Sequence, residues 1–183
     1  MLTFTSDKDT YQVGEEATLY LPGQTGRALV SLENGSQVIE TYWVPLSGEA
    51  KDSTTGFTFE VTEAMVPNVY AHVTMLQPHE QTSNDLPIRM YGALNLEVQN
   101  SATRLQPVID IPSQLAPESE VTLQVSEASE REMAYTVAIV DEGLLDITNF
   151  ATPEPHAYFY AREALGVKTW DLYDYVIGAY GGE

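Results

Sequence analysis

The chain has 183 residues, 27 acidic and 8 basic, and a formal net charge of −19 at pH 7. This length suits one large or two small domains, and 43% apolar with 19% charged residues is typical of a globular fold. Nucleic-acid backbones and anionic lipid surfaces would repel a chain this acidic. Neither is therefore an expected partner. Apolar runs stay well short of the roughly 20 residues of a membrane-spanning helix, and Met1 opens no signal peptide, so we expect no direct membrane insertion.

The first hundred residues alternate between apolar and polar side chains in short runs separated by Pro, Gly, Asn and Asp. Alternation is typical of strands with one buried face, and many short strands at regular spacing predict an antiparallel β-sandwich. We therefore expect residues 1–99 to form a seven-stranded sandwich domain. The expected strands lie at residues 2–5, 17–21, 27–33, 36–44, 57–61, 69–76 and 90–98.

Asn34-Gly35 separates two of these runs and gives the strongest hairpin signal in the chain. Both residue types tolerate the positive φ of a type I′ turn, so we expect a tight two-residue turn here. Asn34-Gly35-Ser36 also matches a glycosylation sequon, but the turn already accounts for these residues.

A polar stretch at residues 100–103 ends the seventh run and is the predicted domain boundary. Alternation resumes at 104–111, 121–125 and 133–140, and the last of these is the most apolar and is expected to be central. The spacing of residues 115–123 resembles that of residues 11–19, as expected for two tandem copies of one β-domain. With only about four strands up to Thr148, residues 100–183 are expected to form a partial second domain.

The strand-like alternation ends near Asp141-Glu142-Gly143, which we interpret as the end of the apolar strand. Residues 144–148 would form a short continuation of it. Thr152-Pro153-Glu154-Pro155 predicts a stiff extended segment, because proline disfavours helix in its predecessor. Two short helices are expected at 158–165 and 170–177. Trp170, Tyr173 and Ile177 would share one face and cover the exposed edge of the incomplete domain.

Metal binding has weak support. The acidic cluster of Asp141, Glu142 and Asp146 lacks calcium-loop spacing, and solvated surface explains it better. His72, His79 and His156 are too scattered for a zinc motif; His79-Glu80 is a lone pair in a loop, and His72 fits a half-buried strand position. We expect no metal site and no cofactor.

Catalytic motifs are also missing. The chain has no Gly-x-Ser-x-Gly elbow, phosphate loop or dinucleotide fingerprint. Zero cysteines exclude a disulfide and a cysteine nucleophile. Paired carboxylates of a glycan-active enzyme stay open, because the two partners can come from distant strands. On the residues alone, the chain is a non-catalytic β-rich tandem module with no catalytic or cofactor-binding residues.

A more specific signal lies in the last quarter of the chain. Residues 137–150, ending the apolar run in Val140-Asp141-Glu142-Gly143, resemble a segment of bacterial alpha-2-macroglobulin-like proteins. The Thr-Pro-Glu-Pro step and residues 159–167 and 170–174 continue the resemblance, and residues 85–92 also look family-like. The resemblance implies tandem seven-stranded macroglobulin-like domains just upstream of a bait region.

The resemblance also implies a function. Such proteins are proteinase inhibitors: a proteinase cuts the bait, and the inhibitor then traps it, usually through a thioester. The thioester motif Cys-x-x-Gln cannot come from this chain, and the bait would begin at or after Gly181-Gly182. The implied partners are target proteinases, through the intact parent protein, and neighbouring macroglobulin-like domains. The implied location is the periplasm or cell envelope.

A second hypothesis from another class is a cell-surface adhesion or carbohydrate-binding sandwich, which 11 tyrosines would suit. Tyrosine also fills half-buried strand positions well, so this signal is unspecific.

Overall fold

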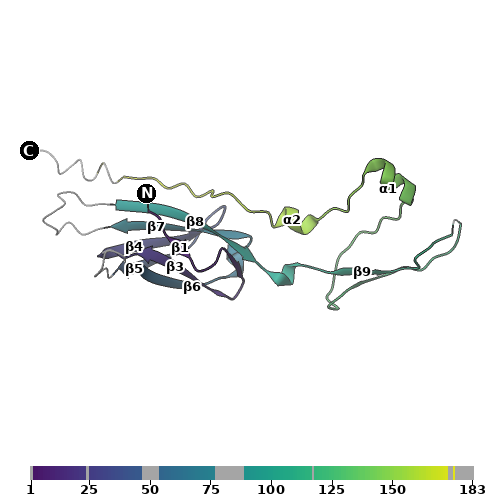
Figure 1. The fold of residues 1–183 in the computed structure, drawn as a ribbon, viewed down its shortest axis with the longest axis horizontal. Helices are drawn as coiled ribbons and strands as arrows, with labels where there is room; N and C mark the ends of the chain where they lie inside the picture. Colours follow the sequence, from purple (N-terminus) through teal and green to yellow (C-terminus); the bar gives the residue numbers. More distant parts are fainter. Residues whose placement is uncertain are drawn as a thin grey trace, which may run out of the picture. The chain divides into compact units, whose positions relative to one another are not determined.

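The computed structural model describes residues 2–23, 25–46, 54–76, 89–116, 118–172 and 175 (Figure 1). The chain divides into two compact units, one of Met1–Gln99 with Tyr160–Glu183 and one of Asn100–Phe159. The division after Gln99 lies next to residues 100–103, for which the sequence predicted a domain boundary. Residues 160–172, however, cluster with the first unit, whereas the sequence grouped them with the second. The assignment of residues 100–183 to a partial macroglobulin-like domain stays a prediction.

The first unit is a β-sandwich of two sheets, as predicted. One sheet has the strand order β1-β3-β6 and the other has the order β2-β8-β7-β4-β5 (Figure 1). Every ladder is antiparallel except the short one between β2 and β8. The strands are β1 (Thr5–Ser6), β2 (Thr10–Gln12), β3 (Glu16–Pro22), β4 (Gly26–Glu33), β5 (Val38–Leu46), β6 (Thr54–Glu60), β7 (Asn68–Leu76) and β8 (Arg89–Gln99).

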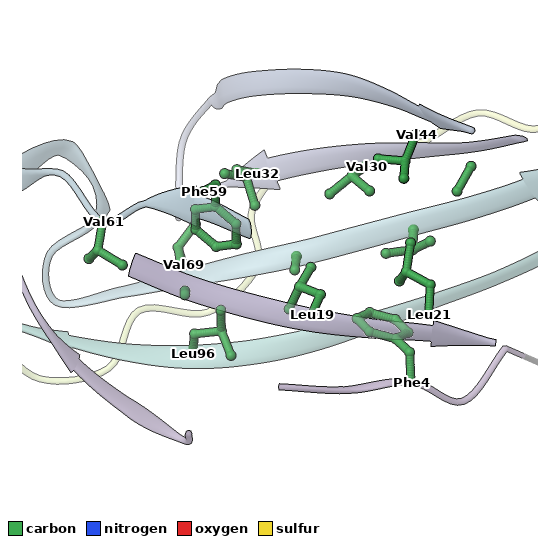
Figure 2. Close-up of a cluster of buried hydrophobic side chains, with 14 of the residues drawn as sticks. Phe4, Leu19, Leu21, Val30, Leu32, Val44, Phe59, Val61, Val69 and Leu96 are labelled. Carbon is green, nitrogen blue, oxygen red and sulfur yellow. The ribbon is translucent and has the colours of Figure 1, made fainter. Parts of the chain in front are cut away.

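The core lies between these two sheets, and alternation along the strands fills it. Ala17, Leu19 and Leu21 of β3 are fully buried. Figure 2 shows Leu19 and Leu21 pointing towards the five-stranded sheet. Val30 and Leu32 of β4 approach them from the opposite sheet. A side-chain period of two along each strand therefore determines which face enters the core.

The described part of the sandwich has eight strands, one more than predicted. The additional strand is β2, which is three residues long and pairs in parallel with β8. The first predicted strand is shifted, because only Thr5 and Ser6 form a ladder, with β3. Leu2 is still held at the sheet, since its N–H donates to the Tyr91 carbonyl at 2.8 Å.

The hairpin between β4 and β5 lies where Asn34-Gly35 placed it, but its turn type was predicted wrongly. Neither residue is among those with positive φ in the described chain, so a type I′ turn is absent there. The loop instead closes through the Asn34 side chain, whose Oδ1 accepts from the backbone N–H groups of Ser36 and Gln37, both at 3.0 Å. A side chain that mimics a backbone turn removes the need for left-handed residues.

The second unit contains less regular structure. It has the strands β9 (Pro107–Asp110) and β10 (Gln124–Glu127), paired with each other, and the helices α1 (Glu142–Thr148) and α2 (Pro155–Phe159). A short 3₁₀ turn, Glu63–Met65, belongs to the first unit, and another, Ser101–Thr103, belongs to this second unit. Among the described residues of this unit, no apolar side chain is buried.

Two strand predictions in this unit were wrong. Residues 133–140 form no ladder within the described part of the chain, and Ile139 is 72% exposed. An apolar strand can be central only where neighbours pair with it, and β9 and β10 pair with each other. Residues 144–148 continue no strand, because they belong to α1, which Asp141 caps by accepting from the Gly143 N–H at 2.9 Å.

The helices expected after Thr152 also differ from those observed. Residues 151–154 are without helix, as the two prolines predicted, and α2 begins at Pro155. The helix ends at Phe159, so 160–165 is not helical. Trp170 is 85% exposed among the described residues, whereas its predicted packing role requires a buried side chain. Tyr173, Ile177 and the predicted start of the bait lie outside the described residues.

Candidate docking site for the C-terminal strap

Residues 160–172, here called the strap, run beside β7 and β8 on the first unit (Figure 1). The alternation of β7 explains which side chains meet it. Val69, Ala71 and Val73 are fully buried in the core, so Tyr70 and His72 point to the opposite face of the sheet. The strap contacts this outer face through polar side chains.

The strongest contact joins Asn68, the first residue of β7, to the backbone of Glu163. The Glu163 N–H donates to Asn68 Oδ1 at 2.8 Å, and Asn68 Nδ2 donates to the Glu163 carbonyl at 3.2 Å. The same Nδ2 also donates to Asn95 Oδ1 of β8 at 2.8 Å. The amide of Asn68 thus pairs with Glu163 as a neighbouring peptide group would. Asn68 is 1% exposed, so its bonds are shielded from water.

Tyr70 supports the same point of the strap. Its hydroxyl donates to the Glu163 carbonyl at 2.9 Å, and the Arg162 guanidinium lies 5.9 Å from the centre of its ring. Cation–ring attraction at that separation is weak at an exposed site, so the hydrogen bonds to Glu163 contribute most.

Two further contacts fix the strap beyond Glu163. Gly166 lies directly against the carbonyl oxygen of Gly35 in the β4–β5 loop, leaving no room for a Cβ. Asp171 forms an ion pair with Arg89 at the start of β8. The strap is therefore attached near its beginning, its middle and its end.

The outer face of the sheet also carries a buried carboxylate. Glu33 is 4% exposed and accepts a hydrogen bond from the Ser31 hydroxyl at 2.7 Å. His72, predicted to be half-buried in mid-strand, has an 18% exposed side chain, and its Nδ1 lies 3.9 Å from Glu33 Oε1. Ser31 and His72 therefore place polar groups beside the buried Glu33 carboxylate.

The remaining residues weighed from the sequence are not brought together. Asp141, Glu142 and Asp146 belong to the cap and body of α1, and His156 Nε2 lies 3.0 Å from Thr103 Oγ1 in the second unit. His79 and Glu80 lie outside the described residues. Within the described ranges, no three His, Cys, Asp or Glu side chains converge as a metal would require. No helix described here has the length and apolar character needed to cross a membrane.

In the second unit, a cluster of hydrogen bonds forms around the Glu127 carboxylate, which nothing in the sequence singled out. Glu127 accepts from the N–H groups of Gln106 at 3.1 Å and Ser129 at 2.7 Å. Arg131 donates to Glu127 through its backbone and side chain, both at 3.2 Å. These bonds, led by the one from Gln106, lower the pKa of Glu127 to about 2. Arg131 also donates to the carbonyls of Ala102 and Arg104, so the cluster joins β10 to the start of the unit.

Comparison with known proteins gives one family. Residues 2–147 match the family model described as the alpha-2-macroglobulin bait region domain. An alpha-2-macroglobulin of Xylella fastidiosa is 26% identical over 182 residues, covering 96% of this chain, and one of Escherichia coli is 23% identical over 188 residues, covering 98%. The family resemblance drawn from the last quarter of the chain is thereby confirmed, although the family model itself reaches only residue 147.

Solved structures agree on the fold. The native conformation of Escherichia coli alpha-2-macroglobulin matches 90% of this chain at 19% identity, with a TM-score of 0.51. A Salmonella alpha-2-macroglobulin mutant, Y1175G, matches 90% at 19% identity, with a TM-score of 0.50. The chain spans 11% of the length of each curated relative, so those proteins contain far more than this part.

Proposed function

Because the chain belongs to the alpha-2-macroglobulin family through its bait region domain, we propose that it is a non-catalytic scaffold of a proteinase inhibitor of the trapping type. Family membership agrees with the expectation that the chain is not an enzyme. It also favours this function over the adhesion or carbohydrate-binding module that the tyrosines suggested.

The observation that carries the proposal is the docked strap. Asn68 and Tyr70 of the sandwich form hydrogen bonds with the backbone of Glu163. Arg89 forms an ion pair with Asp171 near the end of the strap. The chain then continues from this attachment point towards the bait, which the resemblance places at or after Gly181-Gly182. The sandwich thus serves as the rigid support from which a cleavable segment extends.

The second unit fits an incomplete domain. Its described residues form one two-stranded sheet, and large apolar side chains such as Ile139 and Ile147 are 72% and 82% exposed. Exposed apolar surface of this extent marks an interaction site in soluble proteins. We propose that neighbouring macroglobulin-like parts of the parent cover it, including strands that follow the bait. Thr152-Pro153-Glu154-Pro155 would act as a stiff strut within this unit.

The thioester of the trap would come from elsewhere in the parent, because this chain has no cysteine. The proposed partners are proteinases that cut the bait of the parent. The proposed location is the periplasm or the cell envelope, on the basis of the family resemblance. Fractionation of cells expressing the natural gene would test that location.

The function is tested on the intact parent protein mixed with a proteinase. The proposal predicts one early cut in the bait, at or after Gly181-Gly182, followed by co-elution of the proteinase with the parent in size-exclusion chromatography. A matched parent lacking the cleavable segment should leave the proteinase free. If the proteinase elutes free from the cut wild-type parent, trapping is refuted.

A further inference from the structure

We infer that the docking site shields the strap from proteinases that cut after Arg or Lys, so that their first cut falls outside residues 160–172. The inference rests on the proposed function, because it specifies which bonds a target proteinase of this class can reach. The strap contains two basic residues, Arg162 and Lys168, out of 8 in the whole chain. Both are exposed side chains on a segment without helix or strand. Sequence alone would make them obvious cleavage points.

The bond between Arg162 and Glu163 is protected by the backbone contacts of Glu163. A proteinase binds its substrate as an extended chain and pairs with backbone N–H and C=O groups around the bond that it cuts. The Glu163 N–H is already donated to Asn68 at 2.8 Å, and its carbonyl accepts from Tyr70 at 2.9 Å. The enzyme would have to break these bonds before it could bind the chain.

The bond between Lys168 and Thr169 is protected by anchors on both sides. Gly166 packs against the Gly35 carbonyl, and Asp171 pairs with Arg89. The residues between these anchors cannot lift away from the sheet unless one anchor opens. Cleavage then follows the population of the locally opened state, which falls as the anchoring contacts become stronger.

The test is limited digestion of the whole 183-residue chain with trypsin, timed by mass spectrometry. The products that matter are those cut after Arg162 and after Lys168. A synthetic peptide of residues 158–172 gives the rate for an unanchored strap. Tyr70→Phe removes one hydroxyl from the docking site. Asp171→Asn weakens the ion pair with Arg89 without changing a residue of the sandwich.

The control is Thr58→Val. It also removes one hydroxyl, which lies 2.9 Å from Thr18 Oγ1 on the other sheet. We expect both strap bonds to be cut at least about tenfold more slowly in the chain than in the peptide. Tyr70→Phe should speed the cut after Arg162 about fivefold, and Thr58→Val should not.

Two results would overturn the inference. One is cleavage of the folded chain at Arg162 or Lys168 as fast as in the peptide. The other is equal acceleration in Tyr70→Phe, Asp171→Asn and Thr58→Val, which would show global opening instead of release of the strap. Neither result depends on trapping, which is read separately as co-elution with the intact parent. The inference and the proposed function can therefore fail independently.

Discussion

Asn68 holds Glu163 across 95 residues of sequence, and it does so with both halves of one buried amide. Its oxygen accepts the Glu163 N–H, and its nitrogen donates to both the Glu163 carbonyl and Asn95. Because buried polar groups are costly when unpaired, this arrangement specifies one position for the strap on the sheet. The strap is thus positioned by hydrogen bonding, without burial of a large apolar surface.

Asn68→Ala should destabilise the first unit by about 1–3 kcal/mol, because it removes three hydrogen bonds of a buried amide, two to Glu163 and one to Asn95. Denaturant unfolding of the whole chain measures this loss. Asn95→Ala is the comparison, since it removes one acceptor while leaving both bonds between Asn68 and Glu163. We expect a smaller loss for Asn95→Ala. Equal losses in the two variants would mean that the strap adds nothing to stability.

Gly166→Ala should release the strap while leaving the sandwich folded. A Cβ at residue 166 would overlap the backbone carbonyl of Gly35, which cannot move without distorting the β4–β5 loop. Gly35→Ala is a milder change, because its Cβ meets the Glu163 side chain, whose carboxylate can swing away. Hydrogen exchange of the strap amides should therefore rise more in Gly166→Ala than in Gly35→Ala. The reverse order would show that the strap does not approach the loop at Gly166.

The second unit should loosen in acid through Glu127. Hydrogen bonding, led by the Gln106 N–H, lowers the pKa of Glu127 to about 2, against an ordinary value of 4.5. A lowered pKa in the folded state means that the stabilisation is complete above pH 4.5 and is lost as the pH falls towards 2. NMR signals of the Gln106 and Ser129 amides should follow this loss. Glu127→Gln should abolish that acid dependence, and an unchanged acid transition would contradict the assignment.

Trp170→Ser should leave both stability and association state unchanged, within about 0.5 kcal/mol in stability. The sequence suggested that Trp170 covers an exposed edge, but the side chain is 85% exposed. Light scattering and thermal unfolding measure the two effects. Leu19→Ala, at a fully buried position, is the positive control and should cost about 2–5 kcal/mol. A rise in the dimer fraction of Trp170→Ser would restore the covering role.

The sandwich was predictable from the sequence because its information is local. Alternation places Leu19 and Leu21 on one face of β3, and Val30 and Leu32 on one face of β4, so a core between two sheets follows directly. The strand β2 was not predictable, because three residues are too few to show a period and their partner in β8 is distant in sequence. The Asn34 loop was located correctly, but its type depends on side-chain bonds that composition does not reveal.

The docking site was missed for a different reason. Asn68 and Tyr70 are ordinary residues at the start of a strand, and nothing nearby marks them as partners of Glu163. A signal did exist for α1, since Asp141 is a good N-cap and Asn149 ends the helix in a left-handed conformation at φ 48°. That signal was attributed to the end of an apolar strand, because the run before it is strongly strand-like. The strand prediction failed where no neighbouring strand was available.

The most direct test of the docked strap is hydrogen exchange at the Glu163 amide, followed by NMR in the whole chain. The amide donates to a side chain that is 1% exposed, so it should exchange at least about tenfold more slowly than in the peptide of residues 158–172. Asn68→Ala should remove that protection while amides of the central strand β4 stay protected. Exchange of Glu163 at the peptide rate in the unaltered chain would contradict the account, because the strap would then not be held on the sheet.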